Sequence, residues 1–119
     1  MPISIPETLS TITETWSPHL IAQTNDHDIK LAKLDGNFVF HDHPDTDELF
    51  YVLAGEVTIK LENNKNVDLV AGDVYVVPKG VRHCPVGRAA SVLLMEKVGT
   101  INTGNEESDR TKAVADVRR

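Results

Sequence analysis

Hydrophobic and polar residues alternate along much of the chain in a way that predicts β-strands. Val57, Ile59 and Leu61 are separated by polar residues, as in a strand with one buried and one solvent-exposed face. From residue 20 onward, turn residues break the apolar runs at intervals of about 8 to 12 residues, the spacing of antiparallel sandwiches and barrels. The breaks fall at Asn25-Asp26, Asp35-Gly36, Ala54-Gly55, Asn63-Asn64, Ala71-Gly72, Pro78-Lys79-Gly80 and Gly87. We therefore expect an all-β domain.

The first residues predict one short helix over residues 6–14. Ser4 is placed to cap it, Pro6 suits its first turn, and Glu7 lies three residues after the cap, as in a capping box. Three apolar side chains then recur at helical spacing: Leu9, Ile12 and Trp16. This apolar stripe is narrow, so we expect the helix to pack onto a larger structure.

Two further runs are apolar on both faces of a strand. These are residues 38–40, with sequence Phe-Val-Phe, and residues 49–53, with sequence Leu-Phe-Tyr-Val-Leu. A strand of this kind needs cover on its outer face as well as its inner face. We expect a second copy of the chain to provide it, which makes the protein a homodimer. The alternative is that the N-terminal helix covers this face alone.

Composition and length set the broad class. A chain of 119 residues corresponds to one domain, which we place at residues 1–104 with a barrel core at about 20–100. Residues 105–119 have balanced charges and little to bury, and are expected to form a polar tail that is loose or weakly helical. The net charge of −6, without a basic cluster, makes nucleic acid an improbable partner.

Cysteine content and hydropathy exclude other classes. The single cysteine, Cys84, rules out an internal disulfide and a thiolate metal site. The longest apolar run covers residues 49–54, far short of the ~20 residues that span a bilayer. We therefore expect no membrane association and a cytoplasmic location.

Potential metal ligands cluster between residues 41 and 48, and another follows later. His41 and His43 are two residues apart, so in a strand both imidazoles point to the same side. Glu48 follows a four-residue link, and a hairpin-like return would bring its carboxylate back to them. His83 has to arrive from a later strand. Three neutral imidazoles and one carboxylate suit one divalent transition metal (Fe, Mn, Ni, Zn, Co or Cu) and do not suit Mg or Ca, which prefer oxygen ligands.

The residues around these ligands form two recognisable motifs. Gly36-x4-His41-x-His43-x4-Glu48-x6-Gly55 resembles the first conserved motif of the cupin superfamily, and Gly72-x5-Pro78-x-Gly80-x2-His83 resembles the second. The resemblance implies a small jelly-roll β-barrel with a short N-terminal helix, and a metal ion inside it held by His41, His43, Glu48 and His83. Two departures concern the turn before His41, which is one residue shorter than usual, and Gly87, which stands where the family commonly has Asn.

Other polar residues are assigned to structural roles. His19 and His27 lack a paired spacing and are expected at the surface or in turns. Strand alternation sends Cys84 away from His83, so it is interpreted as a small buried hydrophobic residue. Asp45 and Asp47 are expected to solvate a loop; the alternative is that they orient the histidine ligands.

The same alternation predicts part of the wall around the ion. Phe50 and Val52 lie two and four residues after Glu48, and Val39 lies two residues before His41. In strands, these side chains point to the same side as the ligands, so all three are expected to line an apolar cavity. The sequence does not fix the direction of five further side chains, and no role is assigned to them: Trp16, Lys30, Tyr51, Tyr75 and Arg82.

These features favour a small metalloenzyme whose small-molecule substrate binds the metal through its own oxygen atoms. Within cupins, the same ligand set is associated with dioxygenation, isomerisation, lyase chemistry and cyclisation, so the resemblance does not select a reaction. No catalytic acid or base is identifiable beyond the ligands. The alternative is a non-catalytic module that uses the metal to bind or sense a small ligand.

Overall fold

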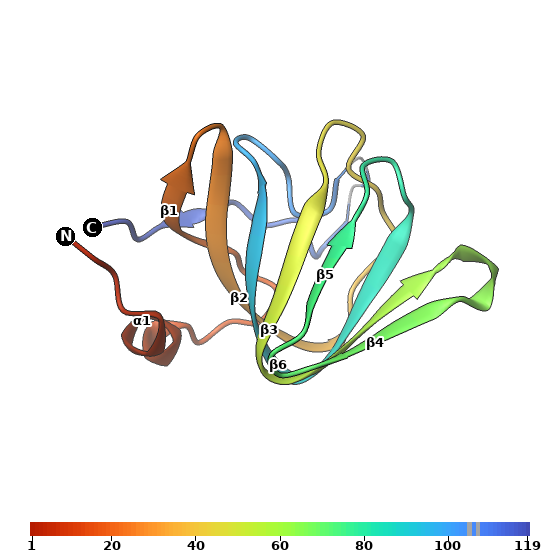
Figure 1. Ribbon diagram of the computed structural model, residues 1–119, viewed down its shortest axis with the longest axis horizontal. Coiled ribbons are helices and arrows are strands. Elements are labelled where there is room, and N and C mark those ends of the chain that lie inside the picture. Colours follow the sequence, from red (N-terminus) through yellow and green to blue (C-terminus); the bar gives the residue numbers. More distant parts are fainter. Residues whose placement is uncertain (105, 107) are drawn as a thin grey trace.

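The computed structural model describes residues 1–104, 106 and 108–119 (Figure 1). Within them, one sheet of seven strands runs in the order β4-β3-β6-β2-β1-β7, and β5 also pairs with β3. The elements are α1 (Ile5–Thr11), β1 (His19–Thr24), β2 (His27–Asn37), β3 (Glu48–Leu61), a 3₁₀ turn (Glu62–Asn64), β4 (Asn66–Val70), β5 (Val74–Val77), β6 (His83–Lys97) and β7 (Ala115–Asp116). The predicted all-β jelly-roll barrel with one short helix is confirmed.

The sheet curves because its long strands carry bulges. The β3–β6 register shifts twice between Val52 and Glu56, and a further shift in β2–β6 lies between Leu34 and Gly36. Gly55, at φ 73°, lies so close to β6 that a Cβ would overlap the carbonyl of Ala89. A Cβ at Gly87 would overlap Leu34 in the same way, which explains a glycine at this position. These close contacts fold the sheet around an interior core.

The helix is shorter than predicted, and its last apolar residue has a different role. The Ser4 hydroxyl accepts the predicted cap bond from the Glu7 amide at 3.3 Å, but the helix ends at Thr11 instead of residue 14. Trp16 has φ 58° and turns the chain inward, where its ring stacks on Phe38 at 4.6 Å between centroids. Trp16 therefore belongs to the interior core and not to the helix stripe.

Helix α1 covers only part of the outer face of the sheet (Figure 1). Leu9 and Ile12 pack there with Leu31 and with Leu53 of β3. Further along β3, the side chain of Tyr51 remains 36% exposed. The alternative in which the helix covers the whole of this run is therefore wrong.

Residues 38–40 do not form a strand, so the expectation of a strand with two apolar faces is wrong there. Phe38 turns into the interior core, whereas Phe40 is 38% exposed. The alternation assumed for this run fails because no β-ladder holds these residues before His41, which makes an isolated bridge to His83.

The C-terminal tail packs back onto the domain. Ala115 and Asp116 form β7, which runs parallel to β1, and the Arg110 guanidinium lies 5.7 Å above the ring of Trp16. The expectation of a loose or weakly helical tail is therefore wrong at these residues, while its positions 105 and 107 lie outside the described residues. Among the described residues, no helix is long and apolar enough to cross a membrane.

Candidate metal centre

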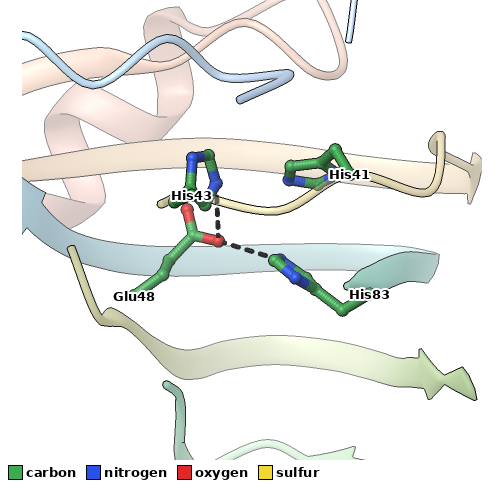
Figure 2. A group of neighbouring side chains, drawn as sticks. All are labelled: His41, His43, Glu48 and His83. Carbon is green, nitrogen blue, oxygen red and sulfur yellow. Dashed lines mark hydrogen bonds and ion pairs between the residues drawn. The ribbon is translucent and has the colours of Figure 1, made fainter. Parts of the chain in front are cut away.

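The structure brings together all four residues expected to bind the metal. One donor atom from each of His41, His43, Glu48 and His83 lies within 4.8 Å of every other, and none of these residues is more than 5% exposed. Figure 2 shows Glu48 at the start of β3 facing His43 and His83, with His41 beside them. The Glu48 Oε1 atom is 3.3 Å from Nε2 of His83 and 3.4 Å from Nε2 of His43.

Backbone hydrogen bonds join the two segments that carry the histidines. The His41 amide donates to the His83 carbonyl at 2.9 Å, and the His83 amide donates to the His41 carbonyl at 2.8 Å. Two residues after His41, the carbonyl of His43 accepts a hydrogen bond from the Gly80 amide at 2.9 Å. The position of the imidazoles is therefore set by the main chain.

Two of the imidazoles have their outer nitrogen fixed by a carbonyl. Nδ1 of His41 lies 2.8 Å from the carbonyl of Val39, and Nδ1 of His83 lies 2.8 Å from the carbonyl of Val81. A carbonyl only accepts, so each Nδ1 carries a proton; Nε2 of His41 then keeps a free lone pair, whereas Nε2 of His83 lies 3.3 Å from the Glu48 carboxylate. In both rings, Nε2 is thus the nitrogen left for a metal.

The charge state of the cluster also suits a cation. Burial, together with the neighbouring His83, lowers the pKa of His41 to about 4, so this imidazole is neutral at pH 7. Burial alone would raise the pKa of Glu48, but the adjacent imidazoles of His43 and His83 hold it well below its usual value. Within the described residues, the buried Nε2 atom of His43 makes no hydrogen bond. The neutral imidazole of His41, the carboxylate of Glu48 and the unpaired Nε2 of His43 together form a candidate site for a first-row divalent metal.

An apolar cavity inside the sheet opens onto this cluster. Its empty space is about 430 Å³, counting the opening to solvent. His41, Glu48 and Phe50 line it, so the expectation for Phe50 is confirmed. The remaining lining residues are Trp16, Pro18, Ala32, Leu34, Phe38, Pro85, Leu94, Glu96 and Asn102.

Two of the expected wall residues lie elsewhere. Val52 is fully buried in the interior core beyond the cavity. Val39 is half-buried and contributes its carbonyl to His41, while Phe38 takes the place on the wall. Strand alternation cannot be extended back from His41 to Val39, because residues 38–40 do not lie in a strand.

A buried ion pair beside the cavity was not found from the sequence. The Lys30 ammonium lies 3.0 Å from Oε1 of Glu96, and these side chains are 1% and 2% exposed. Side chains two residues apart in a strand point to the same side of the sheet. Lys30 is two residues from the buried Ala32 on β2, and Glu96 is two residues from the buried Leu94 on β6, so both point into the interior. The sequence left the direction of Lys30 unassigned and gave Glu96 no role.

The remaining assignments hold. His19 lies against the Ser17 carbonyl and His27 against Asp26, both outside the cluster. Cys84 is buried, and burial raises the pKa of its thiol. Asp45 and Asp47 are both exposed, and Oδ1 of Asp47 accepts from the Lys79 amide at 2.9 Å, which is a loop role.

Comparison with known proteins shows what the chain is similar to. Residues 29–95 match the protein family described as Cupin domain. The uncharacterized protein YdbB of Bacillus subtilis (strain 168) is 43% identical over 63 residues, which are 53% of this chain and 56% of that protein. The chain thus matches about half the length of this curated relative.

Solved structures share the fold over a longer stretch. A cupin-2 domain containing protein from Shewanella frigidimarina NCIMB 400 is 40% identical with a TM-score of 0.76, over 80% of this chain and 93% of that chain. Hydroquinone 1,2-dioxygenase PnpCD, solved in complex with Fe³⁺, has a TM-score of 0.70 at 21% identity, over 82% of this chain and 32% of that chain. The second likeness concerns the fold alone.

Proposed function

The chain belongs to the cupin domain family, and we propose that it is a small metalloenzyme that acts on an oxygen-bearing small molecule. One divalent transition-metal ion would be held by His41, His43, Glu48 and His83. The observation that carries this proposal is the convergence of their four donor atoms within 4.8 Å in a buried site. Fe, Mn, Ni, Zn, Co and Cu are all compatible with this ligand set.

The cavity supports a role for the metal beyond stabilising the fold. His41 and Glu48 line the cavity as well as the cluster, so a molecule in the cavity lies beside the ion. A bound ion would act as a Lewis acid that polarises the substrate oxygen and lowers its pKa. The wall of the cavity is mainly apolar, and Glu48 is held as a carboxylate next to this contact. Dioxygenation, isomerisation and cyclisation are the reaction classes that use such activation.

Metal analysis and a substrate screen test the proposal. Freshly purified protein should contain close to one transition-metal ion per chain, and His43→Gln should lose it, since this variant removes one nitrogen donor and keeps the size of the side chain. His27→Gln, at the surface, is the matched control and should keep the metal. Loaded protein is then incubated with hydroxylated aromatic compounds, enols and diketones while oxygen and products are measured. Stoichiometric binding without product would instead support the ligand-binding or sensing module.

We also propose that a second copy of the chain covers the outer face of β3 and β5. Leu49 pairs with Val76 and Tyr51 with Val74 across these strands, so the four side chains form one apolar patch. Val74 and Val76 are 57% and 43% exposed, and α1 does not cover them. A patch of this kind on a sheet face favours a homodimer over a free surface.

A further inference from the structure

Glu96 lines the cavity and carries a buried oxygen that has no hydrogen-bond partner among the described residues. Its Oε1 atom is paired with Lys30, but within the described residues its Oε2 atom has no hydrogen-bond partner although it is fully buried. The side chain is 2% exposed, and Glu96 is part of the cavity wall. A buried carboxyl oxygen of this kind is costly unless a further group satisfies it.

Outside the metal cluster, whose His41 and Glu48 also line the cavity, the other polar side chains of the described wall are already engaged. Asn102 donates its Nδ2 to the Arg110 carbonyl at 2.9 Å and accepts from the Lys112 amide at 3.1 Å. The Trp16 indole donates to the Asp35 carbonyl at 3.0 Å. Outside the metal cluster, Glu96 Oε2 is therefore the side-chain atom of the described cavity wall that is left to recognise a polar ligand atom.

The rest of the cavity is built for an apolar ring. The stacked rings of Trp16 and Phe38 form one part of the wall, and Phe50 and Leu94 line it as well. Their carbon surfaces offer dispersion contacts and no hydrogen bonds. A strongly polar molecule such as a sugar would leave most of its hydroxyl groups unsatisfied here.

Glu96 is also placed next to the metal ligands. Leu49 pairs with Met95 across β3 and β6, so the preceding Glu48 and the following Glu96 stand side by side on the inner face. A ring bound against Trp16 and Phe38 would thus meet the metal centre at Glu48 and a second polar group at Glu96.

We propose that Glu96, held in place by Lys30, is the residue that selects the ligand of this cavity, a small apolar ring compound with a hydroxyl group that hydrogen-bonds to Oε2. A hydroxyl both donates and accepts, so it pairs with Glu96 in either protonation state. This inference rests on the proposed function for the site, and adds the chemical class of its substrate.

Fluorescence of Trp16 measures the binding directly, because it is the single tryptophan of the chain and lines the cavity. Phenol and toluene serve as probes of nearly equal size, with and without a hydroxyl group. The ratio of phenol affinity to toluene affinity is measured for the full chain as purified and for the variant Lys30→Met/Glu96→Leu. The ratio should fall about tenfold or more in the variant, because the hydroxyl loses its hydrogen bond to Glu96. Lys30→Met/Glu96→Gln keeps a polar partner at the same place and should keep the ratio.

His43→Gln separates this inference from the metal proposal, because His43 does not line the cavity. The variant should lose the metal but keep the preference for phenol. If the preference is lost in His43→Gln and kept in Lys30→Met/Glu96→Leu, the metal recognises the hydroxyl and the role of Glu96 is overturned while the metal site stands. If purified wild type contains no metal but its preference still depends on Glu96, the metal proposal fails and the selection by Glu96 stands.

A crystal structure of the wild type with phenol gives an answer that does not depend on how the variants fold. The phenol oxygen should lie within about 3.2 Å of Glu96 Oε2, with the ring against Trp16 and Phe38. A hydroxyl turned away from Glu96, or phenol bound outside the cavity, would overturn the inference.

Discussion

His41 and His83 are joined by two backbone hydrogen bonds of 2.9 and 2.8 Å, each residue donating one and accepting one. Their imidazole centroids are 4.4 Å apart as a result. The two segments that carry the histidine ligands are therefore joined by main-chain hydrogen bonds, independently of any ion.

Removal of the metal should leave the fold intact and lower its stability. With a chelator, the far-ultraviolet circular dichroism spectrum should not change, because the main-chain bonds between His41 and His83 remain. Restoring metal to about 100 times its Kd should raise Tm by on the order of 10 °C. Thermal unfolding with and without the ion measures this. Loss of the β-sheet spectrum on chelation would show that the metal is a structural clip required for folding.

Replacing Lys30 and Glu96 together should cost little stability, whereas replacing one of them alone should cost much more. Glu96→Leu leaves the Lys30 ammonium buried without a counter-ion and should cost about 3–5 kcal/mol of unfolding free energy. Lys30→Met/Glu96→Leu replaces both charges with apolar groups of similar size and should recover most of that loss. Urea unfolding of the two variants and the wild type compares them. Equal destabilisation of the single and double variants would contradict a pairwise role.

His41 should make the metal-free protein less stable as the pH falls. Its pKa is about 4 in the folded chain and 6.5 in an unperturbed histidine, so between these values the unfolded chain binds a proton that the folded chain does not. This contribution is complete above pH 6.5 and is lost as the pH falls toward 4. Burial and the neighbouring carboxylate of Glu48 raise the pKa of Glu96, which acts in the opposite direction, since the folded chain then holds the extra proton.

The His41 contribution is isolated by comparison with His41→Gln. The difference in unfolding free energy between wild type and this variant should decrease as the pH falls from 6.5 to 4. A difference that stays constant over this range would mean that His41 titrates alike in both states.

The apolar patch on β3 and β5 should hold the dimer together. Tyr51→Glu places a charge in the patch where the side chain is already partly exposed, so the monomer should fold as before. Light scattering after gel filtration should give the dimer mass for the wild type and the monomer mass for the variant. Val98→Glu, at a residue that is 54% exposed and outside the patch, is the control and should stay dimeric. A monomeric wild type would contradict the proposal.

The sequence could predict the four ligands because their spacing follows strand alternation and matches two motifs. It also predicted the barrel, whose turns fall at residues such as Gly55, at positive φ. It could not predict that Trp16 leaves the helix, because this depends on a backbone turn stabilised by contacts with Phe38. Nor could it place β7, since Ala115 pairs with His19 across almost the whole chain.

The case of Lys30 and Glu96 is different, because their direction was available from parity alone. Each follows the alternation of the apolar residues around it, yet a charged side chain is rarely buried without a partner. The partner is 66 residues away in sequence, and only the β2–β6 register brings the two together. No role was assigned to either residue for this reason.

Anomalous X-ray scattering from crystals of the metal-loaded protein tests the central claim most directly. The claim predicts one strong peak within about 2.0–2.2 Å of Nε2 of His41, His43 and His83 and of a carboxylate oxygen of Glu48. The absence of a peak between these four side chains, or imidazoles that point away from one another in the loaded crystal, would contradict it.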